Sequence, residues 1–360
     1  MRSLPRRLRA WFVSEIAALH PDCFTLVMAT GIISNTLFLE GYHRLSELLF
    51  LTNAVAYAWL AILTIARALR FPHAVWLDLT NPRLVFSFFT LVAANGVFGA
   101  GAHLRGVAAT ALHLWILAVF TWLILIYFSF GVLAFRNTAH CANVVYGEWL
   151  LAIVGTESLV ILGALIGPST GDLSPAVFVL IHMLWGIGIG LYAIFITPLA
   201  YRIFFFAISA EDMTPLLWVV MGAATISTNA GSTLLLTDSG IPSLDSIRPF
   251  IGGVTLIMWA WATWWIPLLL LFGIWKHGVL RVPLTYSPLL WSIVFPLGMY
   301  SLASLRLSFA ADFPPLHALS LAMLWISVVV WIATFTGLVI SSWREFRKFG
   351  RPTSRHTAAQ

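Results

Sequence analysis

The sequence predicts an all-α polytopic membrane protein with ten transmembrane helices. The first observation is composition: 60% of the 360 residues are hydrophobic and only 9% are charged, where soluble domains have about 45–50% apolar and about 25% charged residues. The second is that apolar stretches of about 20 residues recur along the whole chain. The third is an uneven distribution of basic residues between alternate loops. These features exclude an ordinary soluble enzyme, a disordered protein and a nucleic-acid-binding module, and they make the lipid bilayer the expected surroundings.

Each predicted span is long enough to cross a hydrocarbon core of about 30 Å. Each must be helical, because unsatisfied backbone groups in lipid cost several kcal/mol each. We expect one membrane domain at residues 21–343, flanked by basic cytoplasmic tails at 1–20 and 344–360. The ten spans are 22–40, 45–67, 84–103, 107–135, 147–167, 174–207, 215–236, 249–276, 287–307 and 317–343.

The positions of Lys and Arg predict the orientation. With ten spans, both termini lie on one side, and all but four of the 20 basic residues fall on that side. The four exceptions are Arg44, Arg105, Arg248 and Arg306. Basic residues gather in cytoplasmic loops, so we expect a multi-pass protein of the cell membrane with both termini in the cytoplasm.

The spans alternate between two kinds. The even spans are long and carry most of the 17 tryptophans, whose rings suit lipid contact. The odd spans are shorter, and their starts recur every 62 to 72 residues, roughly the period of a repeated supersecondary unit. We therefore expect five helical hairpins, with odd helices inside and even helices outside. Alternatively, the small residues of the odd spans only allow close packing, as in any bundle. These small or helix-breaking residues are Gly31, Gly96, Gly99, Gly155, Gly222, Gly231, Pro296 and Gly298.

No enzyme motif is present: the sequence has no P-loop, HExxH, GxSxG or GxGxxG in the required context. We therefore expect no enzyme activity, no cofactor and no metal site. A remote alternative is a membrane-embedded haem or redox enzyme that uses His113 and His182, which lie within even spans. The simpler interpretation is two solitary polar residues.

Glu157 is the one carboxylate near the middle of a span. A buried charge is expensive there, so three roles stay open. The group could titrate in proton-coupled transport, form a structural hydrogen bond as a neutral acid, or shape a pore entrance.

The middle of the odd spans is polar but carries no Lys or Arg. A pore between them would attract anions through helix dipoles and a basic cytoplasmic vestibule, whereas a cation channel typically has a ring of acids. Amides such as Asn95 and Asn229 could equally form hydrogen bonds between helices. The candidate pore-lining residues are Thr30, Gly31, Phe89, Asn95, Gly96, Thr156, Glu157, Ser227, Asn229 and Gly298.

The ninth span contains a candidate gate. Pro296 removes a helical hydrogen bond and should kink the helix. Phe295, just before it, could then point inward and close a narrow pore. The alternative is that Phe295 only packs in the bundle.

Three blocks of sequence resemble a known family. LHPDCFTLVMATGIISNTLF at 19–38, FFTLVAANGVFGA at 88–100 and VFPLGMYSLA at 294–303 are similar to the tellurite-resistance/dicarboxylate transporter family. Its members include plant slow-type anion channels, fungal malate permeases and fungal sulfite efflux pumps.

The resemblance implies a pseudo-fivefold arrangement of five hairpins, with the odd helices lining a central pore. It also implies a homotrimer with one pore in each protomer, and a gating phenylalanine in the ninth helix, for which Phe295 with Pro296 is the best match. The implied substrates are small anions: chloride, nitrate, sulfite, malate and other C4-dicarboxylates, with a possible link to tellurite resistance. The alternative function is a proton-coupled dicarboxylate or sulfite carrier that uses Glu157.

Overall fold

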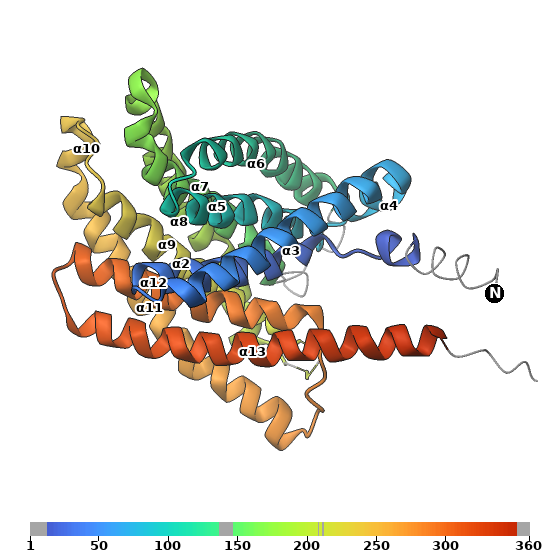
Figure 1. Cartoon of the computed structure of the whole chain (residues 1–360). Helices are drawn as coiled ribbons and strands as arrows, with labels where there is room; N and C mark the ends of the chain where they lie inside the picture. Colours follow the sequence, from blue (N-terminus) through green and yellow to red (C-terminus); the bar gives the residue numbers. More distant parts are fainter. Residues whose placement is uncertain (1–12, 137–146, 208, 211, 351–360) are drawn as a thin grey trace, which may run out of the picture.

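The computed structural model describes residues 13–136, 147–207, 209, 210 and 212–350 (Figure 1). Residues 1–12 and 351–360 of the predicted tails lie outside this part of the chain. Within it all regular structure is helical, and ten helices are long and apolar enough to cross a membrane. Their boundaries agree with the ten predicted spans to within three residues.

The odd spans form the inner helices and the even spans the outer helices. The inner helices are α2 (Thr25–Leu39), α5 (Phe89–Leu104), α7 (Leu151–Ile166), α9 (Val219–Leu236) and α12 (Trp291–Ala310). The outer helices are α3 (His43–Arg70), α6 (Ala108–Arg136), α8 (Ser174–Phe205), α11 (Arg248–Ile274) and α13 (Pro315–Gly350). Two short loop helices, α4 (Pro72–Leu79) and α10 (Pro242–Ser246), are too short to show in a hydropathy profile.

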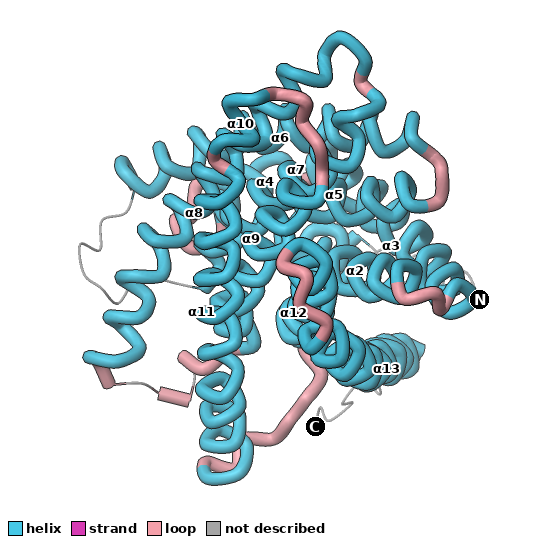
Figure 2. Tube along the Cα trace, turned by 90° about the vertical axis from the view of Figure 1, so that its left-hand side faces the viewer, coloured by secondary structure: helices cyan, strands magenta, loops and turns pink. Residues whose placement is uncertain are grey.

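The inner helices form a closed ring. Each contacts the next in the order α2, α5, α7, α9, α12, and α12 returns to contact α2. Figure 2 is viewed roughly along the axis of this ring and shows α3, α6, α8, α11 and α13 outside it. The inner spans are 78–94% buried and the outer spans 11–44% buried. The predicted five-hairpin architecture is therefore confirmed.

Glycines let neighbouring inner helices approach closely. A Cβ atom added to Gly96 of α5 would lie 2.8 Å from Ser158 of α7, and one added to Gly298 of α12 would lie 2.8 Å from Ile32 of α2. Both distances are shorter than Cβ atoms tolerate, so only glycine fits. Small residues hold helices together in lipid in this way, because backbones that approach closely gain dispersion contacts.

Each outer helix also bonds to the next inner helix round the ring. In all five cases an aromatic N–H or O–H group donates the hydrogen bond. The pairs are Tyr57 to Asn95, Trp122 to Thr156, Tyr192 to the Val220 carbonyl, Trp259 to Ser304 and Trp331 to Thr30. The expectation that the tryptophans of even spans face lipid is therefore only partly right. Trp115, Trp122, Trp185 and Trp265 are buried inside the bundle. The N–H groups of Trp115 and Trp122 donate to the Leu159 carbonyl and the Thr156 hydroxyl of α7, which satisfies donors that lipid would leave unpaired.

The first and last hairpins each contain a further contact of the same kind, between their inner and outer helices. In the first hairpin, the Ser34 hydroxyl donates to the Ser46 carbonyl and the Ser46 hydroxyl donates to the Ser34 carbonyl, both at 2.8 Å. In the last hairpin, Ser301 and Ser320 exchange the same pair of bonds at 2.8 Å. The repeat seen in hydropathy thus extends to side-chain contacts.

All five inner helices run in the same direction, since each is followed by an outer helix that returns. We call the side on which they begin the N-face and the side on which they end the C-face. Each inner helix is preceded on the N-face by a short 3-10 turn. These turns are Pro21–Phe24, Val85–Phe88, Gly147–Leu150, Pro215–Trp218 and Pro288–Leu290.

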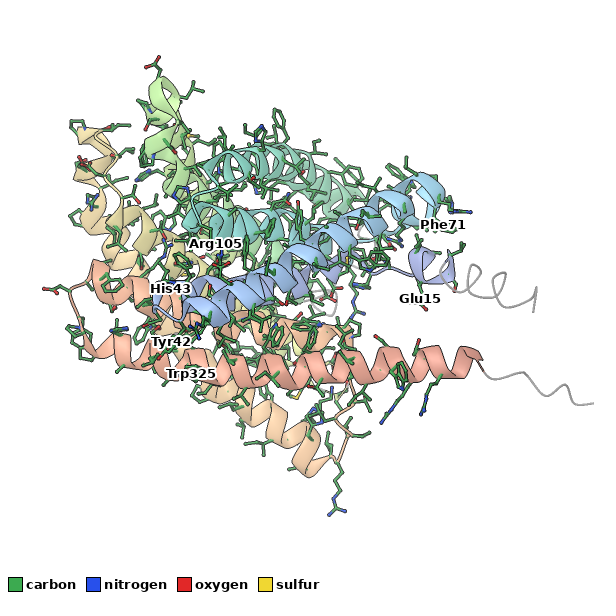
Figure 3. The ribbon with its side chains drawn as sticks, in the orientation of Figure 1. Glu15, Tyr42, His43, Phe71, Arg105 and Trp325 are labelled. Atoms are coloured by element: carbon green, nitrogen blue, oxygen red, sulfur yellow. The ribbon has the colours of Figure 1, made fainter. Side chains whose placement is uncertain are left out.

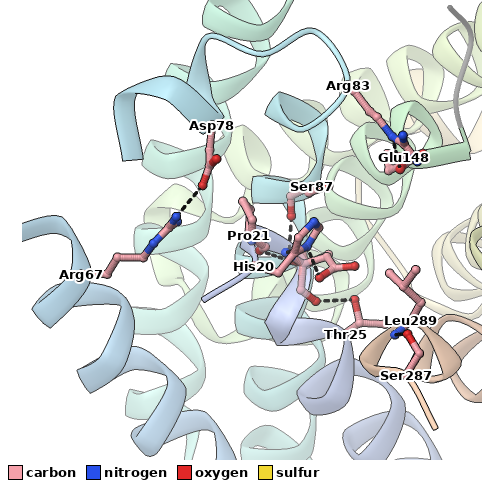
Figure 4. Close-up of polar contacts among 12 residues, drawn as sticks. His20, Pro21, Thr25, Arg67, Asp78, Arg83, Ser87, Glu148, Ser287 and Leu289 are labelled. Atoms are coloured by element: carbon pink, nitrogen blue, oxygen red, sulfur yellow. Dashed lines mark hydrogen bonds and ion pairs between the residues drawn. The ribbon is translucent and has the colours of Figure 1, made fainter. Parts of the chain in front are cut away.

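Ion pairs hold the loops of the N-face. Arg67 pairs with Asp78 at 2.7 Å, and Arg83 pairs with Glu148 at 3.1 Å (Figure 4). On the opposite side, Arg105 fixes the C-face end of α5 (Figure 3). It donates to Glu47 at 2.8 Å and to the Ser46 hydroxyl at 2.7 Å. The arginine thereby ties α5 to the first hairpin.

Candidate functional site

A small cavity lies on the ring axis and is lined by residues from all five inner helices. It is close to the C-face, since Leu39 and Leu104, the last residues of α2 and α5, belong to its wall. Its volume of about 20 Å³ is room for about one water molecule. The wall consists of Ile32, Asn35, Leu39, Gly96, Val97, Ala100, Leu104, Ser158, Ile161, Asn229, Met299, Leu302 and Arg306.

The cavity wall contains one charged side chain, that of Arg306. Arg306 belongs to α12 and is 9% exposed. Its Nη1 donates to the Thr233 hydroxyl at 2.6 Å, and that hydroxyl donates to the Asn229 carbonyl at 2.6 Å. Among the described residues, no carboxylate lies within ion-pair distance of Arg306.

Sequence reasoning did not single out Arg306 as a candidate site residue. It assigned the residue to the far side of the membrane as one of four exceptions to the charge asymmetry. The structure places it four residues before the end of α12, inside the helix and against the cavity. A signal was present: Phe295, Met299, Leu302 and Arg306 are spaced by four, three and four residues, which puts them on one helix face.

Phe295 lies on this same face, about 16 Å from Arg306 along the helix axis, given a rise of about 1.5 Å per residue. Its side chain is fully buried. A Cβ atom added to Gly222 of α9 would lie 2.9 Å from Pro296 Cγ and 3.6 Å from Phe295 Cε1. The Phe295–Pro296 pair is therefore seated against a glycine of the neighbouring inner helix, and α12 is continuous through Pro296.

Among the other candidate pore-lining residues, Gly96 and Asn229 belong to the cavity wall. The Asn229 Nδ2 donates to Met299 Sδ at 3.6 Å, and its Oδ1 has no partner among the described residues. These two residues and Arg306 come from three different helices. The axis therefore brings together residues that are far apart in the sequence, among them the polar side chains of Asn229 and Arg306.

Three polar candidates make their bonds to outer helices. Thr30 accepts from Trp331, Asn95 from Tyr57 and Thr156 from Trp122. The remaining candidates sit at contacts between helices. Gly31 faces Asn53 and Val97, Phe89 faces Gly155, Gly298 faces Ile32, and Ser227 lies next to Glu157.

Glu157 lies behind the ring, between α7, α8 and α9. It is fully buried, and neither carboxyl oxygen has a hydrogen-bond partner among the described residues. A Cβ atom added to Gly188 of α8 would lie 2.7 Å from the carboxyl carbon. Gly188 therefore leaves the space that the Glu157 side chain occupies.

His113 and His182 do not form a joint site. The Nδ1 of His113 lies 2.6 Å from the Ala109 carbonyl, and the Nδ1 of His182 lies 2.7 Å from the Phe178 carbonyl. Each ring thus bonds to its own helix, four residues back. The described residues hold no cluster of three His, Cys, Asp or Glu side chains that could bind a metal ion.

On the N-face, His20 stands before the first inner helix and contacts Asp22 (Figure 4). The hydrogen bond to the Asp22 carboxylate raises the pKa of His20, and the negative charges of Asp22, Asp78 and Glu148 act in the same direction against partial burial. His20 therefore gains its proton more readily than a histidine in water.

Comparison with known proteins gives a consistent assignment. A family model described as the voltage-dependent anion channel SLAC1 matches residues 18–339. This range includes all three blocks on which the family resemblance was based, so the resemblance is confirmed.

Three relatives illustrate the range of similarity. An uncharacterised membrane protein of Mycobacterium tuberculosis is 37% identical over 139 residues, which are 38% of this chain and 70% of that protein. An uncharacterised transporter of Methanocaldococcus jannaschii is 25% identical over 330 residues, covering 89% of this chain and 94% of the relative. A sulfite efflux pump of Arthroderma benhamiae is 19% identical over 360 residues, covering 91% and 92%. The family description and the last two names are those of channels and transporters.

Proposed function

Because this chain belongs to the SLAC1 family of voltage-dependent anion channels, we propose that it transports small anions along the axis of its five-helix ring. The candidate substrates are chloride, nitrate, sulfite and C4-dicarboxylates such as malate. The observation that carries the proposal is the axial cavity, whose wall includes all five inner helices, one arginine and no acidic residue. Such a wall favours anions over cations.

The N-face is the cytoplasmic side in this proposal, since most Lys and Arg residues belong to it. Five inner helices begin there, and each helix N-terminus carries a partial positive charge of about half a unit. Together they would concentrate anions at the cytoplasmic mouth of the axis.

Phe295 is the proposed gate. It is buried, it shares a helix face with three residues of the cavity wall, and it lies on the N-face side of them. A bulky apolar side chain at this level blocks a narrow pore sterically and excludes water from it.

The test is anion flux into proteoliposomes, comparing the wild type with Phe295→Ala for chloride, nitrate, sulfite and malate. Flux should follow the anion gradient and rise at least about tenfold in the variant, because the steric barrier is removed. Phe309→Ala is the matched control: it makes the same substitution in the same helix at a side chain 62% exposed. Equal flux in the two variants would exclude the gate, and absence of anion flux in every protein would exclude the function.

The second candidate is a proton-coupled dicarboxylate or sulfite carrier. It is favoured by Glu157, a fully buried carboxyl group with no partner among the described residues. A carboxyl group in such a place gains or loses its proton with changes in its surroundings. The sulfite efflux pump among the relatives makes sulfite the first substrate to test.

The carrier is tested by imposing a proton gradient at constant anion gradient. Coupled transport should accelerate with the gradient in the wild type and lose that acceleration in Glu157→Gln, which keeps size but cannot ionise. Full acceleration in the variant would remove Glu157 from the coupling.

The assembly follows the family expectation, and we propose a homotrimer in which each protomer has its own axis. The outer helices present many exposed apolar side chains, among them Leu51, Val55 and Ile62 on α3. Such surfaces contact either lipid or a second copy of the chain.

A further inference from the structure

Arg306 differs from the other deeply buried arginines of the described part of the chain. Arg67 pairs with Asp78, and Arg105 pairs with Glu47. Arg306 instead has one neutral partner, the Thr233 hydroxyl. A guanidinium group carries five N–H donors, and a buried charge is expensive unless it is paired. The arrangement is therefore incomplete without a negatively charged partner.

Arg306 lies next to the axial cavity. Arg306 belongs to the wall of the axial cavity, together with Ser158 and Asn229 from two other inner helices. Arg306 therefore borders the space that an anion on the axis would enter. The cavity has room for about one water molecule, so a halide fits it most nearly, a compact oxyanion must widen it slightly, and a dicarboxylate must widen it much more.

The helix dipoles create a need for positive charge at this end. All five inner helices end at the C-face, and each C-terminus carries about half a negative charge. Two of these ends are capped by arginines: Arg105 donates to the Gly101 carbonyl of α5, and Arg248 donates to the Leu235 carbonyl of α9. Arg306 is the arginine that lies on the axis itself, where the negative ends would otherwise repel an anion.

From these observations we infer that Arg306, oriented by Thr233, forms a binding site for one compact inorganic anion at the C-face end of the axis. This inference rests on the proposed anion transport and adds to it the residue that holds the anion after it passes Phe295. Thr233 is a positioning residue: its hydroxyl fixes one Nη1–H of Arg306, which leaves the other N–H groups for the anion.

The first experiment measures binding without transport. Purified wild-type protein in detergent is heated in increasing sodium chloride, sodium nitrate or sodium sulfite, with ionic strength balanced by sodium gluconate, a bulky anion. The unfolding temperature should rise with the compact anions in the wild type, because a ligand that binds only the folded state stabilises it. Arg306→Met should lose this rise and Arg306→Lys should keep part of it. The control Arg44→Met, at an exposed arginine of the same face, should behave as the wild type.

The second experiment measures flux in proteoliposomes as a function of anion concentration. In Arg306→Met the half-saturating concentration should increase at least about tenfold, the factor expected from losing one charge-assisted hydrogen bond. Thr233→Val should give a smaller increase, because the charge remains but its orientation is lost.

The outcomes separate this site from the proposed function. Anion flux in the wild type with an unchanged concentration dependence and unchanged salt stabilisation in Arg306→Met would overturn the site and leave anion transport intact. No flux with any anion, but salt stabilisation that disappears in Arg306→Met, would overturn the transport and leave the binding site. Met is apolar and replaces an unpaired charge, so the variant should unfold at the same temperature as the wild type or higher in gluconate. If Arg306→Met instead fails to fold, salt stabilisation is compared between Arg306→Lys and Thr233→Val. Loss of the stabilisation in Thr233→Val but not in Arg306→Lys would count against a charge-based site.

Discussion

Trp331 donates a hydrogen bond from its indole N–H to the hydroxyl of Thr30 at 2.9 Å. Trp331 belongs to the last outer helix and Thr30 to the first inner helix, so the bond closes the ring between the two ends of the chain. The other four outer helices make the same kind of bond to the inner helix that follows them in sequence.

Trp331→Phe should lower the free energy of unfolding by at least about 1 kcal/mol, the usual net value of one hydrogen bond. Phenylalanine lacks the N–H donor, which leaves the Thr30 hydroxyl without this partner, and it is smaller than the indole, so some packing is lost as well. Thermal unfolding in detergent measures the effect. Trp325→Phe is the control, since that ring is 40% exposed and packs edge-on against Tyr42 (Figure 3). Equal stability of the two variants would show that the ring-closing bond contributes nothing.

Gly188→Ala should destabilise the protein by about 1–3 kcal/mol, the range for overpacking a core. The new methyl group would occupy the place of the Glu157 carboxyl group. Gly186→Ala and Gly190→Ala are matched controls in the same helix, where an added Cβ meets nothing within 4 Å. They should be neutral or slightly stabilising, because alanine favours helix more than glycine does.

A double mutant sharpens this test. Adding Glu157→Ala to Gly188→Ala should restore part of the lost stability, since the two side chains no longer compete for one space. Strict additivity of the two changes would mean that they do not interact.

Gly222→Ala should raise anion flux, though less than Phe295→Ala does. The added Cβ would lie 2.9 Å from Pro296 Cγ and must displace the Phe295–Pro296 pair from its seat. Flux in proteoliposomes measures the change, and Gly253→Ala on α11, where nothing lies within 4 Å, is the control. A flux that is unchanged in Gly222→Ala while the protein stays folded would contradict a gate at this seat.

The stability of the protein should fall as the pH rises above 6.5, the ordinary pKa of histidine. His20 has a raised pKa in the folded state, chiefly through its hydrogen bond to Asp22. Its contribution is therefore fully present below the unfolded-state pKa and is lost as the pH passes through the higher folded-state pKa. His20→Gln should flatten this part of a plot of unfolding temperature against pH. A plot of unchanged slope would assign the dependence to other groups.

The sequence predicts the spans well because hydropathy and length are direct physical requirements of the bilayer. The division into inner and outer helices also follows from it, since glycines such as Gly96 and Gly298 serve close approach while tryptophans gather on the long spans. The short helices α4 and α10 do not follow, because they lie in loops, where no such requirement acts.

The direction of each side chain around an inner helix was much harder to predict. A helix buried on every side has no polar stripe that reports which face meets the axis. Thr30, Asn95 and Thr156 are polar and central in their spans, yet they satisfy donors of the outer helices. Arg306 was overlooked for the opposite reason: it stands near a helix end, where an arginine usually reaches water.

The bond from Trp331 to Thr30 also has a consequence for biosynthesis. The first inner helix is synthesised early, but the donor for its Thr30 hydroxyl emerges from the ribosome 301 residues later. By then α12 has been synthesised, and its contact with α2 can close the inner ring before the last outer helix is in place. A chain that stops before the last helix therefore keeps all five inner helices, but it leaves Thr30 without this donor and leaves α12 and α2 uncovered on the side where α13 packs.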